Sequence, residues 1–518
     1  MTFAAAADAI VMAERVGYTF PGSERAALAE ISLTFAPGSL TVLAGPTGSG
    51  KSTLLRVLAG LIPGSASGRM EGRVRLFDLD TRGASSLDLA TRAGLVLQSP
   101  DDQICTADPV SEVAFGLENL CLPVPEIERR IDQWLDRFGL NAQRNQATNT
   151  LSGGQKQRLT LASILAMGPR LLLLDEPLAQ LDAAGADGLL DELDTLRAAG
   201  LTVVVAEHRL DELLHRANRL LILADGRVVS DVPAGRPEAI EALRRANLTL
   251  AATPGESQSN ATNASNTIAH INELSFCWPG RTQPLWSDVG FDIRAGECLA
   301  VVGPNGSGKS TLLAALAGLV SPSAGRIVLA GATPGSTQIG LTPQNADLTL
   351  FCRTVADELA FGPRQLRLEP AEVARRVSQT AEALAIHNLM DQPPLALSQG
   401  QRLRVAVAAA LTLRPRLLLL DEPSTGQDPQ QVCRLLSAVR ALLTASEIGA
   451  VLFSTHDPRL VERYATRVLV VAEGQLLADC SPAALFSDAV LMSRAGFRAP
   501  PAQFSATTES SAIARPTR

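Results

Sequence analysis

Short apolar runs alternate with longer stretches of helical spacing along most of the 518-residue chain. Residues 40–44 and 299–302 are two such runs, and a glycine-rich segment followed by a helical stretch comes after each. Residues 171–174 and 417–420 are four leucines each, the pattern of a strand buried on both faces of a sheet. The alternation of buried strands and helices predicts an α/β fold.

The same series of motifs occurs twice along the chain. Gly45-Pro-Thr-Gly-Ser-Gly-Lys51-Ser52 recurs as Gly303-Pro-Asn-Gly-Ser-Gly-Lys309-Ser310, an offset of 258 residues. Thr150-Leu-Ser-Gly-Gly-Gln155 recurs as Ala396-Leu-Ser-Gln-Gly-Gln401, and the leucine runs recur with the same offset of 246 residues. The motifs keep their order, with 12 fewer residues after the first motif of the later copy. A period this long indicates a duplicated domain and not a solenoid.

We therefore expect two similar domains, residues 1–250 and 268–498. Residues 251–267 between them are rich in Ser, Asn and Thr with almost nothing to bury, so we expect a flexible linker. Residues 499–518 have a similar character and are expected to be disordered.

Composition narrows the function. The net charge of −7 and an aromatic content of 4% argue against a nucleic-acid partner. The seven cysteines form no Cys-x-x-Cys pair, which indicates buried thiols in a reducing compartment. The N-terminus has no basic region before Glu14 and is interpreted as the lead-in to a strand, not a signal peptide. No apolar run reaches the 18 or more residues of a membrane helix. We expect a soluble, cytoplasmic protein.

Each glycine-rich motif has the strand–loop–helix context of a phosphate-binding loop. Its glycines let backbone N–H groups turn toward phosphate oxygens at the positive end of the helix. Lys51 and Lys309 would reach the β- and γ-phosphates, while Ser52 and Ser310 would bind Mg²⁺. The nucleotide-binding candidates here are Gly45, Pro46, Thr47, Gly48, Ser49, Gly50, Lys51, Ser52 and Thr53, with Gly303, Pro304, Asn305, Gly306, Ser307, Gly308, Lys309, Ser310 and Thr311.

Each leucine run ends in Asp-Glu. Asp175 and Asp421 would emerge at the strand end to support Mg²⁺. Glu176 and Glu422 could then polarise the attacking water. Two adjacent acids alone would usually be a solvated strand end, but a phosphate loop upstream favours catalysis.

Leu-Ser-Gly-Gly-Gln just before the Asp-Glu strand resembles the signature of ATP-binding-cassette (ABC) ATPases. The resemblance covers nearly the whole chain and implies two tandem P-loop cassettes, each with a nucleotide-binding core sheet and a helical subdomain that carries the signature. Further positions resemble the family's other motifs. They are Gln98 and Gln344 (Q-loop, sensing Mg²⁺ and water), His208 and His456 (switch histidine), Asp182 and Asp428 (D-loop), and Phe20 and Trp278 (adenine stacking).

The resemblance implies that ATP is bound between cassettes that pair head to tail within this chain. One site would join the first phosphate loop to Ser398, Gly400 and Gln401, and the other would join the second loop to Ser152, Gly153, Gly154 and Gln155. Gln399 stands where Gly153 stands. We expect it not to disable the site, because a hydroxyl and N–H groups at a helix N-terminus are kept, unless the position needs a positive φ.

The segments after the two Q-loop glutamines resemble those of the double-cassette ATPases of energy-coupling-factor (ECF) importers of vitamins and transition metals. They are Val110-Ser-Glu-Val-Ala-Phe-Gly and Val355-Ala-Asp-Glu-Leu-Ala-Phe-Gly. That resemblance implies a polytopic membrane coupling subunit, a substrate-binding membrane component and a place at the cytoplasmic face of the membrane. Asp101, Asp102 and Glu112 could face basic residues of the coupling subunit or be solvated acids.

Three alternatives differ in sequence. A tandem-cassette translation factor has a long charged helical linker, whereas residues 251–267 are short and little charged. A DNA-repair cassette would have zinc-binding cysteines, whereas the cysteines of this sequence form no Cys-x-x-Cys pair. A tandem sugar-importer ATPase typically has a degenerate second phosphate loop, and both loops here are intact.

Overall fold

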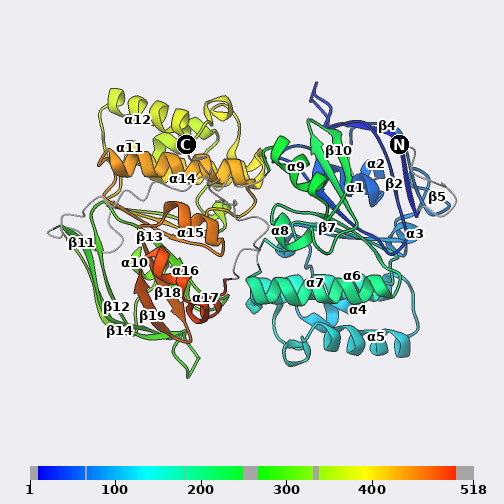
Figure 1. Cartoon of the computed structure of the whole chain (residues 1–518), viewed down its shortest axis with the longest axis horizontal. Coiled ribbons are helices and arrows are strands. Elements are labelled where there is room, and N and C mark those ends of the chain that lie inside the picture. The colour runs from blue at the N-terminus through cyan, green and yellow to red at the C-terminus, as the bar shows by residue number, and fades with distance from the viewer. Residues whose placement is uncertain (1–9, 65–66, 180, 249–265, 331–337, 498–518) are drawn as a thin grey trace, which may run out of the picture.

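The computed structural model describes residues 10–64, 67–179, 181–248, 266–330 and 338–497. Figure 1 shows two halves side by side, with residues up to 248 in one and residues from 266 in the other. Nearly all of the expected linker and tail lies outside the described residues. No helix in the described part is long and apolar enough to cross a membrane.

Each half is built on a six-stranded sheet in which five strands are parallel and one edge strand is antiparallel. In the first half the spatial order is β10 (Arg227–Pro233), β9 (Arg219–Ala224), β3 (Leu40–Ala44), β8 (Thr202–Ala206), β7 (Leu171–Asp175) and β6 (Ala93–Val96). In the second half it is β19 (Gln475–Cys480), β18 (Arg467–Ala472), β13 (Cys298–Val302), β17 (Ala450–Ser454), β16 (Leu417–Leu420) and β15 (Ile339–Thr342).

The leucine strands show why both faces must be covered. All five residues of β7 are buried, and alternate leucines belong to different hydrophobic clusters. Leu172 and Leu174 pack toward the helices, whereas Leu171 and Leu173 pack toward α1 (Lys51–Leu58) and a second sheet. Side chains that alternate along a strand account for this division.

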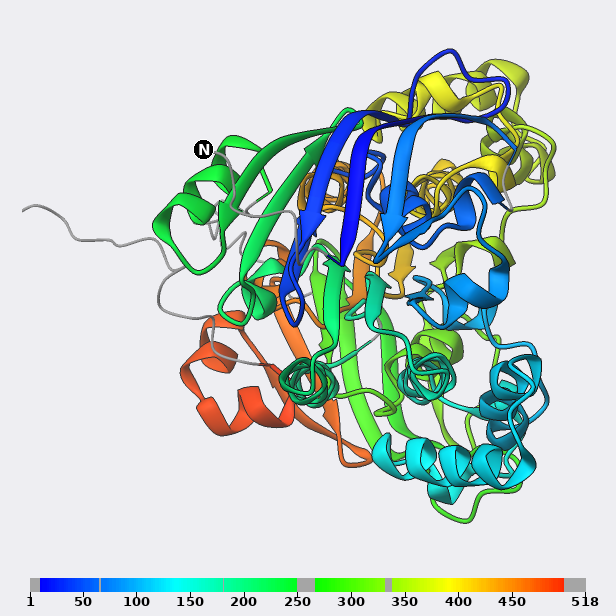
Figure 2. The same cartoon turned by 90° about the vertical axis from the view of Figure 1, so that its right-hand side faces the viewer.

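The second sheet of each half is antiparallel and starts with the first strand of that half. In the first half it contains β2 (Leu28–Phe35), β1 (Val11–Thr19), β4 (Arg69–Leu76) and β5 (Leu79–Asp80). In the second half it contains β12 (Trp286–Arg294), β11 (Thr267–Phe276) and β14 (Ala324–Leu329). Figure 2 shows the blue strands of the first half above the cyan helices of its helical subdomain.

A helical subdomain carries each signature. The first consists of α4 (Pro109–Asn119), α5 (Val124–Arg137) and α6 (Gly153–Ala166). The second consists of α11 (Val355–Gln365), α12 (Pro370–Ala383) and α13 (Gln399–Thr412). α5 has a strongly amphipathic sequence whose buried residues, Ile127, Ile131 and Leu135, recur at the helical spacing of four. The predicted fold class, two α/β cassettes with helical signature subdomains, is confirmed.

The 12-residue difference falls between the phosphate-loop helix and the next core strand. The first half has α2 (Leu61–Gly64), β5 and α3 (Ser86–Ala90) in this region. The described residues of the second half have only β14 between α10 (Lys309–Leu316) and β15. The extra residues of the first half therefore lie between the phosphate-loop helix and the strand that precedes the Q-loop.

The two halves lie in opposite orientations. Figure 1 shows α4 and α5 at the bottom of the first half and α11 and α12 at the top of the second. Hydrogen bonds cross between them at two matched places, from Thr47 to Asp428 and from Asn305 to Asp182. Head-to-tail pairing therefore brings the phosphate loop of each half to the far half.

Candidate functional site

Both phosphate loops end in a left-handed glycine at the start of a helix. Gly50 (φ 102°) caps α1, and Gly308 (φ 94°) caps α10. Only glycine reaches this conformation at little cost, and it directs the following N–H groups into the loop. Lys51 Nζ donates to the Gly45 carbonyl at 2.8 Å, and Lys309 Nζ donates to the Gly303 carbonyl at the same distance.

The buried hydroxyl and ammonium groups of the two phosphate loops suit a phosphate ligand. The Oγ atoms of Ser49 and Ser307 are buried without a hydrogen-bond partner among the described residues. Burial lowers the pKa of both lysines, against the opposing effect of nearby carboxylates. An anion with several oxygens supplies both a counter-charge and acceptors for these groups.

The two acidic strand ends have an unusual backbone. Glu176 and Glu422 both adopt positive φ, 50° and 49°, immediately after a buried strand. For a non-glycine residue this conformation costs on the order of 1–3 kcal/mol. The Glu176 N–H donates to the Ala206 carbonyl, and the Glu422 N–H donates to Ser454 Oγ. These bonds hold each glutamate at the sheet edge, facing the loop lysine.

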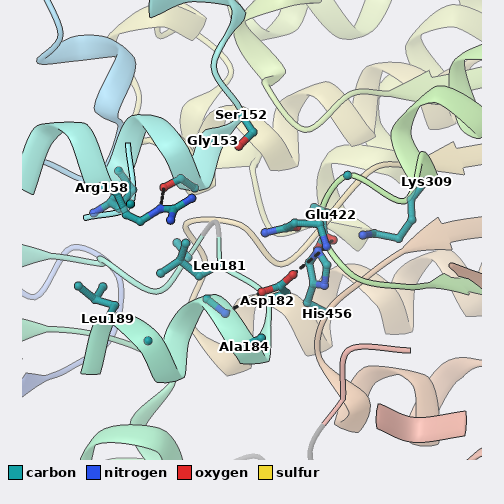
Figure 3. A pocket seen from close by; sticks show the side chains of 18 of the residues that line it. Ser152, Gly153, Arg158, Leu181, Asp182, Ala184, Leu189, Lys309, Glu422 and His456 are labelled. Atoms are coloured by element: carbon teal, nitrogen blue, oxygen red, sulfur yellow. Dashed lines mark hydrogen bonds and ion pairs between the residues drawn. The ribbon is translucent and has the colours of Figure 1, made fainter. Parts of the chain in front are cut away.

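One pocket joins the second phosphate loop to the first signature. Its volume is about 780 Å³, and Figure 3 shows Ser152 and Asp182 on one side with Lys309, Glu422 and His456 on the other. Ser310, Gln344, Trp278, Gly153 and Gly154 also line it. Every motif expected for this composite site therefore contributes at least one residue to the lining, whereas five expected residues do not line it: Gln155, Gly303, Pro304, Ser307 and Asp421.

The other composite region brings the first phosphate loop to the second half. The Thr47 N–H donates to Asp428 Oδ2 at 2.8 Å, and the Asp428 N–H donates back to Thr47 Oγ1 at 3.2 Å. Gln98 lies against Gly426, which belongs to the same turn as Asp428. In the matched region the Asn305 N–H donates to Asp182 Oδ2 at 2.9 Å.

The signatures are the N-termini of α6 and α13. Ser152 and Ser398 each form a capping box, in which the serine accepts from the backbone of Gln155 or Gln401 and that glutamine side chain accepts in return. Gln399 is the first helical residue of α13 and is not among the positive-φ residues. The strain that would have made a glutamine costly at this position is therefore not present.

The two glutamates differ in their surroundings. Gln98 Nε2 donates to Glu176 Oε2 at 2.7 Å, and His208 Nε2 lies 3.3 Å from Glu176 Oε1. His456 Nε2 lies 3.1 Å from Glu422 Oε1, but no bond joins Gln344 to Glu422 among the described residues. The Q-loop glutamine therefore holds the glutamate in only one region.

These contacts move the two pKa values in opposite directions. Burial alone would raise the pKa of Glu176, but His208, Lys51 and Gln98 outweigh burial and lower it. Burial raises the pKa of Glu422 to about 7, with Lys309 opposing the shift. Burial also lowers the pKa of His456 to about 3, and Lys309 and Arg209 add to that shift. Glu422 and His456 thus tend toward a neutral pair.

Beside each glutamate lie a serine hydroxyl and an aspartate carboxylate, whose oxygens fit Mg²⁺ as ligands. Ser52 lies beside Asp175 and Ser310 beside Asp421, and each serine lowers the pKa of that carboxyl against the larger effect of burial. Burial raises the pKa of Asp175 to about 6 and also raises that of Asp421, so a nearby cation would stabilise both ionised forms. Hydroxyl and carboxylate oxygens are ligands that Mg²⁺ prefers.

The aromatic residues ahead of the loops are matched in geometry. Phe20 packs edge-on against Tyr18 with ring centroids 4.9 Å apart, and Trp278 packs edge-on against Phe276 at the same distance. Phe20 is 39% exposed and Trp278 is 46% exposed, so part of each ring is open to solvent. Trp278 lines the pocket of Figure 3.

Comparison with known proteins agrees with this geometry. The family model described as "ABC transporter" matches residues 28–179 and 286–425, one match in each half. The chain belongs to the ABC transporter family. It is an ABC ATPase with two cassettes, and the predicted family and activity are confirmed.

Relatives in this family have the same double length. A "Putative ABC transporter ATP-binding protein" of Methanosarcina mazei is 35% identical, over 93% of this chain and 91% of its own. The "Putative HMP/thiamine import ATP-binding protein YkoD" of Bacillus subtilis is 32% identical, over 93% of each chain. Among solved structures, cbiO1 from Clostridium perfringens, described as part of the ABC transporter complex cbiONQ, is 30% identical. It covers 47% of this chain and 96% of its own, with a TM-score of 0.41.

One of the three acidic residues expected as candidates to face a membrane partner beside the first Q-loop of this ABC ATPase is buried. Glu112, expected as one candidate to face a membrane partner, is 6% exposed, and its carboxylate accepts from the backbone of Cys105 and Thr106. A glutamate at the start of a helix can satisfy the N–H groups of a preceding turn, and here it orders the Q-loop segment. Asp101 is paired with Lys156 of α6, whereas Asp102 is exposed.

No individual role was predicted from the sequence for two residues beside the first switch histidine. Glu207 is buried and accepts from the backbone of Leu178, His208 and Arg209. Arg209 donates to the carbonyls of Leu178 and Leu181 at 2.6 and 2.7 Å, so it holds the turn that carries Asp182. The signal was present: the second cassette has Thr455 and Asp457 at the matched positions.

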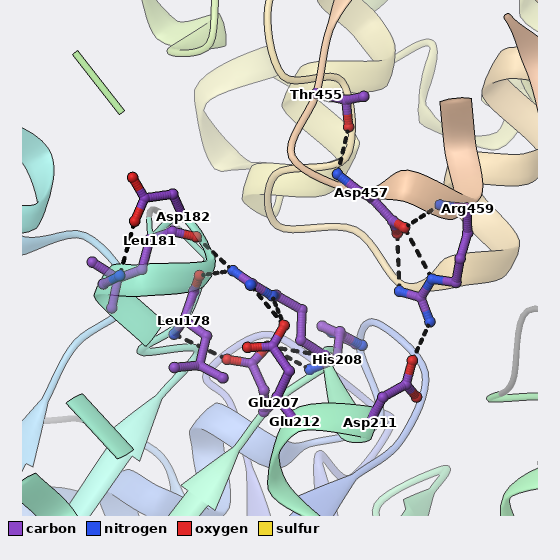
Figure 4. Close-up of polar contacts among 12 residues, drawn as sticks. Leu178, Leu181, Asp182, Glu207, His208, Asp211, Glu212, Thr455, Asp457 and Arg459 are labelled. Carbon is purple, nitrogen blue, oxygen red and sulfur yellow. Dashed lines mark hydrogen bonds and ion pairs between the residues drawn. The ribbon is translucent and has the colours of Figure 1, made fainter. Parts of the chain in front are cut away.

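Figure 4 shows how the second cassette uses its different residues. Asp457 accepts from Arg459, and Arg459 Nη1 reaches across the interface to Asp211 Oδ2 at 3.0 Å. The first cassette therefore holds its own D-loop with an arginine, whereas the matched segment of the second cassette makes a bridge between the cassettes.

Proposed function

We propose that this chain is the ATP-hydrolysing subunit of an ECF-type importer of a vitamin or a transition metal, with two Mg·ATP sites inside one chain. The observation that carries the proposal is the pocket of about 780 Å³ in which Lys309 of one cassette and Ser152 of the other line the same cavity. A site of this kind is complete only when the cassettes are closed on each other, which makes ATP binding the step that drives a movement.

The side chains at each site divide the work. Lys51 or Lys309 neutralises the β- and γ-phosphates, and the signature serine of the opposite cassette binds the γ-phosphate at a helix N-terminus. Glu176 or Glu422 accepts a proton from the attacking water, while His208 or His456 contacts the γ-phosphate. Ser52, Asp175 and Gln98, or Ser310, Asp421 and Gln344, would hold Mg²⁺, which neutralises charge on the phosphates.

Two exposed patches beside the Q-loops suit a membrane coupling subunit. In the second cassette, the ring centroids of Phe351 (64% exposed) and Phe361 (40% exposed) lie 4.8 Å apart in an edge-to-face contact, and Leu348, three residues before Phe351, is 76% exposed. In the first cassette, Phe115 is 51% exposed at the position that matches Phe361. Exposed aromatic clusters of this kind mark protein interfaces.

These patches are linked to the signature helices. Asp101 pairs with Lys156 of α6, and Asp347 pairs with Arg402 of α13 at 2.8 Å. A partner that docks beside the Q-loop would therefore shift the helix whose N-terminus meets ATP. The printed name of the Bacillus relative, a "Putative HMP/thiamine import ATP-binding protein", supports a role in import. A separate membrane component would select the transported substrate.

Co-purification from membranes tests the partner. The tagged full-length chain is expressed with its neighbouring membrane-protein genes, extracted in detergent and analysed for the bound polytopic subunit and any retained ligand. We expect Phe361→Ser and Phe351→Ser to lose the membrane subunit while the purified chain still binds ATP. Val229→Ser, another exposed apolar side chain on β10, is the matched control and should retain it. A chain that never requires a polytopic partner for membrane association would contradict the proposal.

A further inference from the structure

The two cassettes carry a glycine and a glutamine in opposite order at two matched positions, one in the signature and one in the D-loop. The first cassette has Gly153 in its signature and Gln180 in its D-loop. The second has Gln399 and Gly426 at the matched positions, each 246 residues later. Each cassette therefore keeps one glutamine and one glycine in this pair, in opposite order. In the second cassette, whose two positions are described, the Gln399 side chain lies in the space next to Gly426.

The geometry of the second cassette shows that space. A Cβ atom at Gly426 would lie 3.1 Å from Gln98 Nε2 and 3.2 Å from Gln399 Cδ, which is closer than nearly all real Cβ contacts. Gly426 also has φ of +69°, a conformation that other side chains rarely adopt. Gln98 of the first cassette and Gln399 of the second therefore lie together over Gly426.

The start of α13 is packed directly on this D-loop. A Cβ atom at Gly400 would lie 2.7 Å from the Gly426 carbonyl oxygen, so the two glycines permit a close backbone approach. In the first cassette a Cβ atom at Gly154 would meet Leu181 Cδ2 at 3.4 Å, an ordinary contact. The signature and D-loop of the second cassette thus form the tighter unit, and Gln399 extends from it toward the first cassette.

The neighbour of Gln399 is the amide that holds the first glutamate. Gln98 Nε2 donates to Glu176 Oε2 at 2.7 Å, and this bond has no equivalent between Gln344 and Glu422 in the described chain. The Q-loop contact is therefore formed in the composite site whose signature has glutamine, and not in the site whose signature has Gly153.

We propose that Gln399 is a positioning residue of the first ATP site: its side chain fills the space over Gly426 and keeps the Gln98 carboxamide against Glu176. The inference rests on the composite ATP sites proposed above. Under it, the departure from the family's signature is an adjustment to the glycine in the D-loop, and it acts on the catalytic base of the opposite cassette. Gln399 acts through Gln98 and does not itself contact the reacting atoms.

Steady-state ATPase of the full-length chain tests this, with Glu422→Gln as the parent so that turnover reports the first site. Gln399→Ala should lower kcat about three- to tenfold, with a much smaller change in KM for ATP, because the base loses its position but the nucleotide keeps its contacts. Gln399→Met keeps the volume and should retain most of kcat. The acidic limb of the kcat profile should move to higher pH in the alanine variant only, because Gln98 favours ionised Glu176.

The exchange itself supplies a second test. Gly426→Gln alone should lower kcat, because its side chain meets both glutamines, whereas Gln399→Gly with Gly426→Gln copies the arrangement of the first cassette and should exceed Gly426→Gln alone. If wild type hydrolyses ATP but Gln399→Ala keeps the parent's kcat and pH profile, the positioning role is refuted. The role is also refuted if Gln399→Ala and Gln399→Met lose kcat equally. It is refuted as well if the kcat of the double variant equals the value expected from multiplying the separate effects of Gln399→Gly and Gly426→Gln. If wild type does not hydrolyse ATP, the proposed function itself fails.

Discussion

Asp182 of the first cassette accepts a 2.9 Å hydrogen bond from the backbone N–H of Asn305, which lies in the phosphate loop of the second cassette. The same carboxylate accepts from the N–H of Gly185 and caps α7 (Ala183–Ala198). Although burial alone would raise the pKa of Asp182, the two backbone N–H groups outweigh burial and lower it. One ionised side chain thus joins a helix of one cassette to the phosphate-binding loop of the other.

Asp182→Ala should therefore weaken the second ATP site more than the first. It removes a charge-assisted hydrogen bond worth on the order of 1.5–3 kcal/mol, so turnover at the site containing Lys309 should fall about tenfold or more. Asp428→Ala should do the same to the site containing Lys51, because Asp428 accepts from Thr47. The measurement is ATPase rate in the Glu176→Gln and Glu422→Gln backgrounds. Equal effects of each substitution on both sites would contradict this assignment.

The double variant Glu176→Gln with Glu422→Gln should bind ATP but hydrolyse it about 10²–10⁴-fold more slowly, the usual contribution of a positioned base. Glutamine keeps the size of each side chain at its positive φ, so binding should persist. Filter binding and phosphate release check the two quantities separately. Near-normal turnover would show that the base lies elsewhere.

The two sites should differ in their pH dependence. A base acts when it is ionised, so a raised pKa removes activity on the acid side. Glu422 has a pKa raised to about 7, so the Glu176→Gln variant, which relies on Glu422, should lose about tenfold per pH unit below 7. Glu176 has a lowered pKa, so the Glu422→Gln variant should begin to lose its rate at a lower pH than the Glu176→Gln variant does. Identical acidic limbs in the two variants would rule out this difference.

Arg209→Met should loosen the first D-loop and so reduce turnover at the second site. It leaves the carbonyls of Leu178 and Leu181 without their donor, at a cost of about 1–3 kcal/mol. Arg216→Met, an arginine paired with Asp191 and Asp194 of α7, is the matched control and should leave turnover unchanged. Thermal unfolding of both variants separates lost stability from lost turnover. A loss confined to the first site would contradict the proposed route through Asp182.

Much of the architecture could be predicted from the sequence, because each motif is tied to a local backbone. The phosphate loops follow a buried strand and begin a helix, so Lys51 and Ser52 were placed by their neighbours in the chain. The signature serines were predicted at helix N-termini, and both form capping boxes there. Repetition then predicted two similar halves, and the structure shows the same strand order in their two six-stranded sheets.

Contacts that depend on rotamers and on packing between the cassettes could not be predicted. Glu112 was expected as one candidate to face a partner, but its buried carboxylate accepts hydrogen bonds from the N–H groups of Cys105 and Thr106. Among the described residues, the bond from Gln98 to Glu176 has no counterpart between Gln344 and Glu422, although both sites have a Q-loop glutamine and an Asp-Glu pair. Arg209 acts on backbone carbonyls about 30 residues away, and no spacing rule indicates such a contact.

The most direct test of the composite sites is to ask which signature serves which phosphate loop. ATPase activity is measured for Ser152→Ala and Ser398→Ala in each single-glutamate background. In Glu176→Gln the remaining turnover comes from the site of Lys309 and Glu422, and we expect Ser152→Ala to abolish it while Ser398→Ala leaves it largely intact. In Glu422→Gln the two serines should exchange roles. Turnover that depends instead on the serine of the same cassette as the active glutamate would contradict the account.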